Sequence, residues 1–391
     1  MTAPQKFGDA IELIHEHASA LTGSDDFGPK DYLPGLRIIL RSADCDVRFT
    51  PGGRELAWRI LRDVLAARAY AVKMWAEHPA ALTEPIIQPL VITGIPRTGT
   101  TALHKLLATD PQFQGLENWL MLSPMPRPPR DQWSNYPAYE RAHEFLETTF
   151  GLVPAKRTSH NVVADEVDEC LEVLRQSFVS NRWACTWKAP SYDAWWQTQN
   201  EQLAYEWYAN VLRLIGHGYA EKRWLLKNPG HVANLDLLFR VFPDACVVQT
   251  HRNPIYAIPS ISNGIRLSHR VYEGDQADDF ATLIGPREME KWAHALSRAK
   301  PVRESHRRQI FDIDHSRFTR EPMVVIREIY RHFDLHLTES TERSMIARTV
   351  AKPERKYGEH RYDVNDLGLI TGEIEERFMG YIEEFDLTHS D

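Results

Sequence analysis

The residues best suited to chemistry begin in a glycine-bounded loop at positions 94 to 101, which reads GIPRTGTT. Its spacing nearly matches the phosphate-binding pattern G-x-x-x-x-G-K-[ST], in which backbone N–H groups and a helix N-terminus surround phosphate oxygens. Thr100 stands where that pattern has lysine. Because that lysine normally reaches the β and γ phosphates, the loop disfavours a nucleoside triphosphate. It predicts a 5′-phosphate that carries something smaller than a diphosphate.

Other residues of the loop keep the remaining parts of a phosphate site. Gly99, Thr100 and Thr101 preserve the backbone cradle, and Arg97 supplies a cation within it. A glycine turn that merely joins a strand to a helix is the alternative interpretation of these residues.

A second candidate group lies in the segment HRNPIYAIPS, at positions 251 to 260. Arg252 comes just after an apolar run that is typical of a buried strand, and Ser260 follows eight residues later. A guanidinium and a hydroxyl at the mouth of a strand could bind a second, separate phosphate. Taken alone, an arginine such as Arg252 is more often a surface ion-pair residue.

The elements that must position these groups alternate between strand and helix patterns. Apolar runs predict buried strands, and the segment after each one has helical spacing of its apolar residues. Such alternation favours an α/β fold with a central parallel sheet of the P-loop-like, three-layer kind, whose ligands bind at the carboxyl ends of the strands. The predicted strands are 90–95, 223–228, 245–251 and 309–313.

The first 85 residues show helical spacing at 8–23 and 54–76. They predict a helical N-terminal region, 1–85, that packs on an α/β domain over 86–391. Within that domain we expect residues 120–215 to form helical and loop insertions over an acceptor site. The proline-rich segment 125–137 predicts a surface loop or lid without regular structure. The acidic run ADEVDE, at 164 to 169, predicts the start of a helix that continues to residue 178, since carboxylates favour helix N-termini.

Composition narrows the function classes. The chain has 391 residues, of which 43% are hydrophobic and 26% are charged, and its net charge is −8. These values are typical of a globular protein, and the negative charge predicts no nucleic-acid partner. Neither a signal peptide nor a transmembrane segment is expected. The four cysteines lack CxxC spacing, which favours a cytoplasmic location.

Three motifs together resemble a known family. The segments PRTGTT, RWLLKNPGH and THRNPIYAIPS follow three predicted strands in order. This arrangement is similar to the sulfotransferases that use 3′-phosphoadenosine 5′-phosphosulfate (PAPS), most closely to their bacterial branch, and the segment HRYDVNDLGL (360–369) resembles that branch's tail. The resemblance implies a transfer of sulfate from PAPS to a small-molecule hydroxyl. It assigns the 5′-phosphosulfate to Arg97, Thr98, Gly99, Thr100 and Thr101, and the 3′-phosphate to Arg252 and Ser260.

The resemblance also implies the groups that perform the transfer. Lys227, at the end of a predicted strand, resembles the lysine that neutralises the leaving oxygen, and Arg97 could share that role. Two residues compete as the base. Glu117 has the spacing of the glutamate base in protein-tyrosine sulfotransferases, and we favour it over His231, which is similar to the histidine base of the cytosolic branch. His160 is a weaker candidate for the acceptor pocket.

No metal is expected, because the sulfonate carries one charge and the sequence holds no metal-ligand motif; the run DIDH (312–315) predicts a strand end with solvated acids. Two other functions remain open at this stage: a P-loop nucleotide kinase and a non-catalytic nucleotide-binding module. The acceptor is open as well. The tryptophans at 183, 187, 195, 196 and 207 could pack in the core or cover an apolar acceptor such as a lipid or glycolipid.

Overall fold

The computed structural model describes residues 2–159, 162–351 and 363–389. Five strands form one parallel sheet in the order β2-β3-β1-β4-β5. Their bounds are β1 Leu90–Thr93, β2 Phe113–Gln114, β3 Arg223–Lys227, β4 Cys246–His251 and β5 Ile310–Asp314. The four strands expected from the sequence are confirmed, and the two-residue β2 is an additional edge strand that was too short to be recognised.

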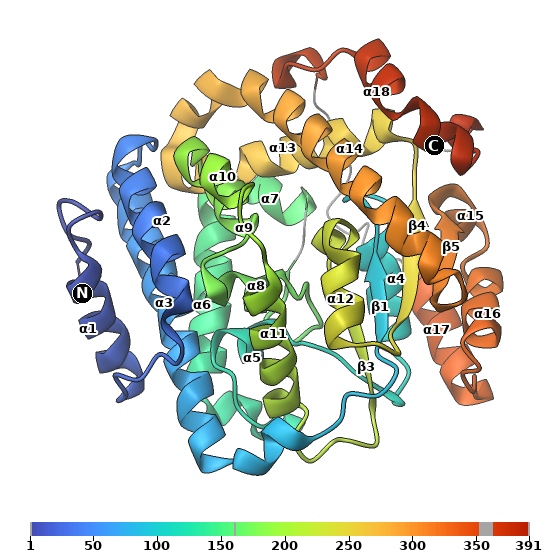
Figure 1. Ribbon diagram of the computed structural model, residues 1–391, viewed down its shortest axis with the longest axis horizontal. Coiled ribbons are helices and arrows are strands. Elements are labelled where there is room, and N and C mark those ends of the chain that lie inside the picture. Colours follow the sequence, from blue (N-terminus) through green and yellow to red (C-terminus); the bar gives the residue numbers. More distant parts are fainter. Residues whose placement is uncertain (1, 160–161, 352–362, 390–391) are drawn as a thin grey trace.

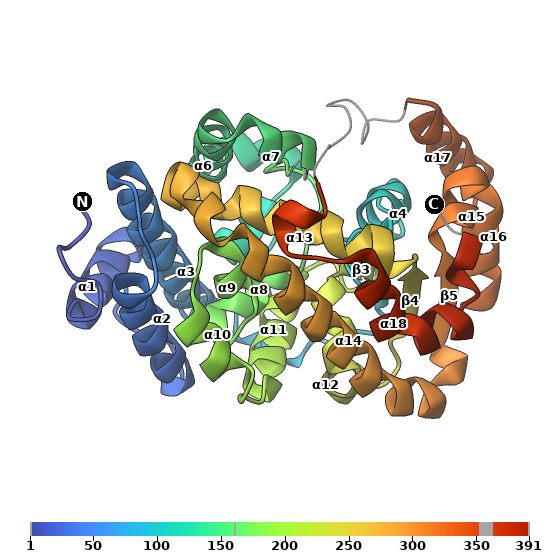
Figure 2. The same ribbon diagram turned by 90° about the horizontal axis from the view of Figure 1, so that it is seen from above.

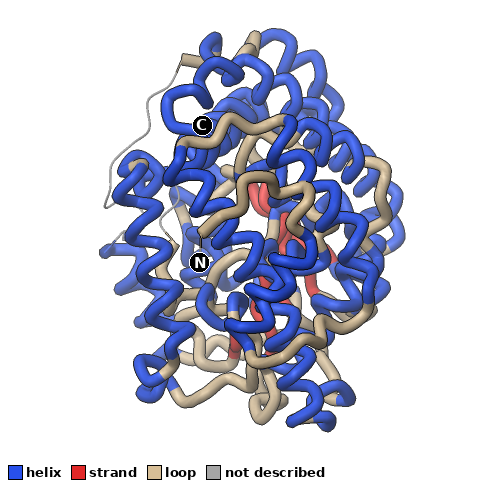
Figure 3. The backbone as a smooth tube through the Cα atoms, turned by 90° about the vertical axis from the view of Figure 1, so that its left-hand side faces the viewer, coloured by secondary structure: helices blue, strands red, loops and turns tan. Residues whose placement is uncertain are grey.

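Helices surround this sheet on both faces, which Figure 3 shows as red strands enclosed by blue helices. The helices before β3 are α1 Ile11–Thr22, α2 Leu33–Cys45, α3 Pro51–Glu77, α4 Thr100–Leu107, α5 Asn118–Leu122, α6 Pro137–Leu152, α7 Pro154–Ser159, α8 Leu171–Leu174, α9 Arg182–Thr186, α10 Pro190–Trp196 and α11 Gln202–Ile215. Those after β3 are α12 Leu235–Val241, α13 Pro254–Glu273, α14 Ala281–Ser305, α15 His315–Arg320, α16 Pro322–His332, α17 Glu339–Ala351 and α18 Thr371–Glu384.

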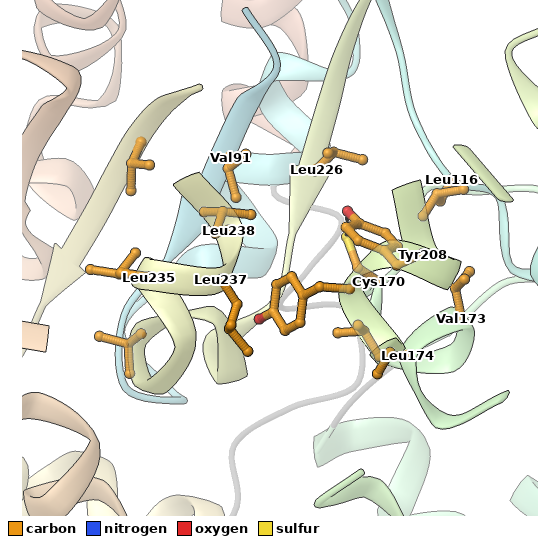
Figure 4. Close-up of a cluster of buried hydrophobic side chains, with 14 of the residues drawn as sticks. Val91, Leu116, Cys170, Val173, Leu174, Tyr208, Leu226, Leu235, Leu237 and Leu238 are labelled. Carbon is orange, nitrogen blue, oxygen red and sulfur yellow. Dashed lines mark hydrogen bonds between the residues drawn. The ribbon is translucent and has the colours of Figure 1, made fainter. Parts of the chain in front are cut away.

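The alternation of side chains along each strand gives the sheet two buried faces. On one face, Val91 and Leu226 belong to one apolar core with residues of α11, α12 and α14. Figure 4 labels Tyr208 of α11 and Leu238 of α12 among them. Leu90, Ile92 and Leu225 pack with α4 and α16 on the other. Both faces are covered, so the predicted three-layer α/β fold is confirmed.

A second apolar core lies beside the sheet, on the left of Figure 1. It joins α1, α2 and α3 to the aromatic segment around α9 and α10 and to the end of α13. Trp183 and Trp187 are fully buried there, so these two tryptophans are core residues. Arg68 of α3 is also fully buried and donates to the carbonyls of Phe27, Pro29 and Gln176. The predicted N-terminal helical region is therefore tied to the middle of the chain, while its boundary at residue 85 stays a prediction.

Two local expectations were wrong. Residues 164–169 form a turn and an extended segment, with a bridge between Glu117 and Val167, and the helix begins only at Leu171. The acids pair with cations from distant elements instead of capping a helix, as with Glu166 and Lys105 (Nζ–Oε2 2.5 Å). The segment 125–137 is not wholly irregular, because Arg130–Asn135 form a 3₁₀ helix whose Trp133 is buried.

Candidate functional site

A cavity of about 1170 Å³ opens at the carboxyl ends of β1, β3 and β4. Because β1 lies between β3 and β4, the loops that follow these three strands meet at one edge of the sheet. Further walls come from the helical segments between Asn118 and Tyr205, from α13 and from α14. Figure 2 shows α13 crossing the molecule between α7 and the strands.

The loop after β1 has the backbone shape that its glycines predict. Gly94 has φ +135°, and a Cβ there would lie 2.4 Å from the carbonyl oxygen of Thr250. Gly99 has φ +87° and directly precedes α4, so a side chain at either position would strain or displace the loop. The loop therefore places the N-terminus of α4 against the cavity.

Arg97, Arg252 and Ser260 form one cluster across the mouth of β1 and β4. The Arg97 Nε donates to the Ser260 Oγ at 3.0 Å, and the Arg252 Nη1 donates to the Arg97 carbonyl at 3.1 Å. Arg97 holds φ +71°, which is uncommon for a residue other than glycine. Ser260 lies in the second turn of α13, which Asn253 caps by accepting from the Ile255 N–H. Two guanidiniums and a hydroxyl thus converge on the cavity.

The threonines of the loop have different roles. Thr98 is fully buried, and its hydroxyl bonds to the Ile95 carbonyl and to the Thr250 hydroxyl, so its side chain holds the loop in shape. Thr100 and Thr101 line the cavity. The Thr101 hydroxyl lies 3.3 Å from the Lys227 Nζ, from which it accepts a hydrogen bond.

Lys227, at the last position of β3, is 1% exposed. Its ammonium donates to the Glu169 carboxylate at 2.6 Å, and that carboxylate lines the cavity. A buried ammonium needs such a partner, because an unpaired charge away from water is costly. Lys227 therefore stands at the junction of the loop after β1 and the acidic segment.

Glu117 lies elsewhere. Its carboxylate forms an ion pair with Arg127, which also donates to the Gly115 carbonyl at 2.5 Å. Glu117 is 9% exposed, and the cavity is lined by its neighbour Asn118 instead. The structure therefore pairs Glu117 with Arg127 and does not place it in the cavity wall beside Glu169, the partner of Lys227.

His231 is also set back from the cavity. It is fully buried, and its Nδ1 is 2.8 Å from the Tyr205 hydroxyl, which does line the cavity. Burial lowers the pKa of His231 to about 3, so the ring is neutral near pH 7. His160 lies outside the described residues, as do positions 360–362 of the tail motif.

Several cavity residues were missed by the sequence analysis. Glu169 belongs to the acidic run that was interpreted as a helix start. The ring centroid of Tyr256 lies 5.5 Å from the guanidinium of Arg252, and His315 and Arg348 also line the cavity. Glu201 also lines the wall, where burial raises its pKa to about 7. Only the topology brings these distant positions together, so no local spacing could identify them.

Within the described ranges, no group of three or more histidine, cysteine, aspartate or glutamate residues is arranged to hold a metal. Asp312, from the run DIDH, instead pairs with His251 and with Arg303, and Asp314 caps α15. The same ranges contain no helix with the length and apolar character that a membrane crossing requires.

Comparisons with known proteins agree with this geometry. Residues 89–339 match the profile described as "Sulfotransferase family". Over 191 residues the chain is 27% identical to the omega-hydroxy-beta-dihydromenaquinone-9 sulfotransferase Stf3 of Mycobacterium bovis and of Mycobacterium tuberculosis. That match spans 47% of this chain and 47% of the length of those relatives.

Solved structures are similar over nearly the whole chain. The sulfotransferase STF1 from Mycobacterium tuberculosis is 33% identical, with a TM-score of 0.84 over 96% of this chain and 100% of its own. STF9 from Mycobacterium avium is 25% identical, with a TM-score of 0.82 over 96% and 97% of the two chains. The resemblance carried by the three motifs is thereby confirmed, and this chain belongs to the sulfotransferase family.

Proposed function

We propose that this protein transfers a sulfuryl group from PAPS to a hydroxyl of a small, lipid-like acceptor. One observation carries the proposal: the Arg97–Arg252–Ser260 cluster and the lysine-free loop line one cavity at the carboxyl ends of three adjacent strands, and the buried Lys227 donates to two residues of its wall, Glu169 and Thr101. The loop at 97–101 and the adjoining Arg252 and Ser260 supply oxyanion-binding groups for both phosphate positions of PAPS, and the loop lacks the lysine that would bind the β and γ phosphates of a triphosphate.

The donor would lie with its 5′-phosphosulfate on residues 97–101 and its 3′-phosphate on Arg252 and Ser260. Backbone N–H groups at the start of α4 and the Arg97 guanidinium would bind the phosphosulfate oxygens. Thr98 would act through its backbone, since its hydroxyl is used within the protein. No metal is required by this arrangement, because two arginines and a lysine supply the positive charge.

The transfer itself would be an in-line displacement. The acceptor oxygen attacks the sulfur, the bond between sulfur and the bridging oxygen breaks, and the negative charge develops on the 5′-phosphate that leaves. Lys227 would stabilise that charge, and Arg97 would assist it. The acceptor proton passes to a carboxylate.

We propose Glu169 as that carboxylate. Glu169, which is paired with Lys227, lines the cavity, whereas Glu117, which is paired with Arg127, and His231, which is bonded to Tyr205, are not among the residues of its wall. Glu117 and His231 stay predictions from the sequence. A matched pair, Glu169→Gln and Glu117→Gln, separates them: we expect Glu169→Gln to lower kcat by about a hundredfold or more and Glu117→Gln to lower it less. The reverse order would return the role to Glu117.

The chemical class of the acceptor is inferred from the apolar residues in the cavity wall and from the name of a related sulfotransferase. Phe145, Leu146, Phe150 and Ile265 give the cavity an apolar side. The name of Stf3 states that it acts on a hydroxylated menaquinone, which is a lipid. We propose that residues 120–215 cover a hydroxyl acceptor with an apolar body in the same way, in a cytoplasmic enzyme whose four cysteines are free thiols.

Calorimetry with adenosine 3′,5′-bisphosphate, ADP and ATP tests the donor site. We expect the bisphosphate to bind selectively, because Arg252 and Ser260 recognise a 3′-phosphate that ADP and ATP lack. A preference for ATP would contradict the proposal and would favour a nucleotide kinase. Radiolabelled PAPS with extracted lipids then tests the transfer, and bisphosphate binding without any transfer would favour a non-catalytic nucleotide-binding module.

A further inference from the structure

Three basic side chains gather in the cavity wall beyond the proposed donor site. Lys156 of α7, Arg175 of the 3₁₀ turn after α8, and Arg182 of α9 all line the cavity together with Glu172, and we name these four residues the cation cluster. Glu172 accepts from the Arg175 Nη2 at 2.7 Å and from the Arg182 Nε at 3.1 Å. The cluster therefore combines three cations with one carboxylate, which leaves an excess of positive charge.

Arg175 has unused hydrogen-bond donors. It is 2% exposed, and its Nε and Nη1 have no hydrogen-bond acceptor among the described residues. The guanidinium lies against the ring of Trp183, at 5.4 Å from the ring centroid, which orients it without satisfying those N–H groups. Buried donors without acceptors are rare and costly, and each one calls for an explanation. A bound oxyanion would satisfy both nitrogens.

Lys156 points to the same conclusion. Its Nζ donates to the Ser268 Oγ at 2.9 Å. Burial, and then the charge of Arg182, lower the pKa of Lys156 to about 7. An ammonium that is crowded by guanidiniums is stabilised when an anion joins the group.

The cation cluster is distinct from the groups assigned to the 3′-phosphate. Ser268 and Ser260 both belong to α13 and are eight residues apart, which corresponds to about 12 Å along a helix. Between the two, Ile261, Gly264 and Ile265 line the cavity. Ile60, Phe150 and Leu174 provide further apolar contacts in the wall. The cluster thus lies at the far end of a partly apolar cavity.

We propose that the cation cluster binds an anionic group, a carboxylate or a phosphate, on the sulfate acceptor. The acceptor class would then be an acidic hydroxyl compound with an apolar body, oriented by its charge so that its hydroxyl faces Lys227. The identification of the bound anion as part of the sulfate acceptor rests on the proposed function. The anion site itself rests on Arg175, Lys156 and Arg182.

Matched acceptors test the charge requirement. The probes are para-hydroxyphenylacetate and ω-hydroxydodecanoate, each compared with its methyl ester, and para-hydroxyphenyl phosphate as the phosphate arm. With radiolabelled PAPS we expect kcat/KM for an acid to exceed that for its ester by about tenfold or more, as for hydrogen bonds to a charged partner. A higher value for the phosphate than for para-hydroxyphenylacetate would identify phosphate as the preferred anion.

Variants then locate the anion. Arg175→Gln and Lys156→Gln should each bring the acid-to-ester ratio close to one, whereas Arg175→Lys should restore part of it. If Arg175→Gln does not fold, Lys156→Gln still tests the site, because Lys156 is only half-buried and its replacement disturbs the core less. Lys300→Gln is the control, because it removes one positive charge that pairs with Glu384 away from the cavity, and it should keep the wild-type ratio.

Direct binding separates this inference from the proposed function. If no sulfate is transferred and adenosine 3′,5′-bisphosphate does not bind, the proposed function fails. Calorimetry with the same acids still tests whether the cation cluster binds an anion. Binding that weakens in Arg175→Gln or Lys156→Gln supports the anion site. An acid-to-ester ratio near one in the wild type, a ratio unchanged in both variants, or no acid binding at millimolar concentration would overturn it.

Discussion

At the residue scale, the burial of Lys227 distinguishes it from an ordinary surface lysine. An ammonium with 1% exposure is held by Glu169 and the Thr101 hydroxyl at the place where three strand ends meet. The residue types of the site, which are Lys227 together with Arg97, Arg252 and Ser260, are common on protein surfaces. Their convergence on one cavity makes them a candidate site for charge stabilisation.

Replacing Lys227 by methionine tests its assigned role. Methionine keeps much of the side-chain volume and removes the charge, so we expect kcat for sulfate transfer to fall by about a hundredfold to a thousandfold, as for other groups that stabilise a developing oxyanion. Calorimetry should show that binding of adenosine 3′,5′-bisphosphate is retained. Full activity in Lys227→Met would remove the residue from the mechanism.

Arg252 makes a separate prediction. Arg252→Ala should weaken binding of adenosine 3′,5′-bisphosphate by about tenfold to a hundredfold, because a hydrogen bond to a charged group contributes about 1.5 to 3 kcal/mol. Binding of adenosine 5′-phosphate, which lacks the 3′-phosphate, is the matched control and should change little. Equal losses for the two nucleotides would place Arg252 outside the 3′-phosphate site.

At the scale of elements, the loop between β1 and α4 sets the position of the first turn of α4. Its two positive-φ glycines let the backbone turn beneath Thr250 and bring the first turn of α4 to the cavity. In the acidic segment 164–169, by contrast, tertiary contacts override the local preference. Local preference favours a helix there, but ion pairs with Lys105 and Lys227 and the bridge to Glu117 stabilise an extended path.

Gly94→Ala tests the loop. A Cβ at this position would meet the Thr250 carbonyl oxygen at 2.4 Å, and φ +135° is unfavourable for alanine. We expect the free energy of unfolding to fall by about 2 kcal/mol or more, and bisphosphate binding to weaken, because the loop must shift. Gly52→Ala is the control, since a Cβ there meets nothing within 4 Å. Equal stability of the two variants in urea unfolding would contradict the assigned loop geometry.

At the scale of the whole molecule, buried histidines link stability to pH. Burial lowers the pKa of His104 and of His231 to about 3 from the ordinary value of 6.5. The unfolded chain therefore binds protons that the folded protein excludes, and stability is lost as the pH falls below 6.5. Glu201 and Glu273, whose pKa values burial raises to about 7, act in the opposite direction over part of this range.

A comparison of variants isolates one histidine from these opposing effects. His104→Leu should gain stability relative to the wild type as the pH falls below 6.5, by about 1.4 kcal/mol per pH unit. Urea unfolding at about pH 7.5 and about pH 5.5 measures the difference, and the carboxylates cancel because both proteins contain them. The exposed His336, changed to glutamine, should show no such gain. A pH-independent difference for His104→Leu would mean that the ring titrates alike in the folded and unfolded states, contrary to a lowered pKa.

The sequence by itself determined the α/β class, four of the five strands and the two segments that form the Arg97–Arg252–Ser260 cluster. These features are local: a strand, a glycine turn and a helix start each depend on neighbouring residues, and parallel strands necessarily bring their carboxyl ends to one edge.

Only the tertiary structure decided which carboxylate accompanies Lys227 and where the charges of the cavity lie. Glu169 and Lys227 are separated by 58 positions in the chain and are joined at 2.6 Å, while Glu117, which has the expected spacing, is paired with Arg127. Ion pairs and burial depend on groups that folding brings together from distant elements. The local preferences of each segment therefore could not predict them.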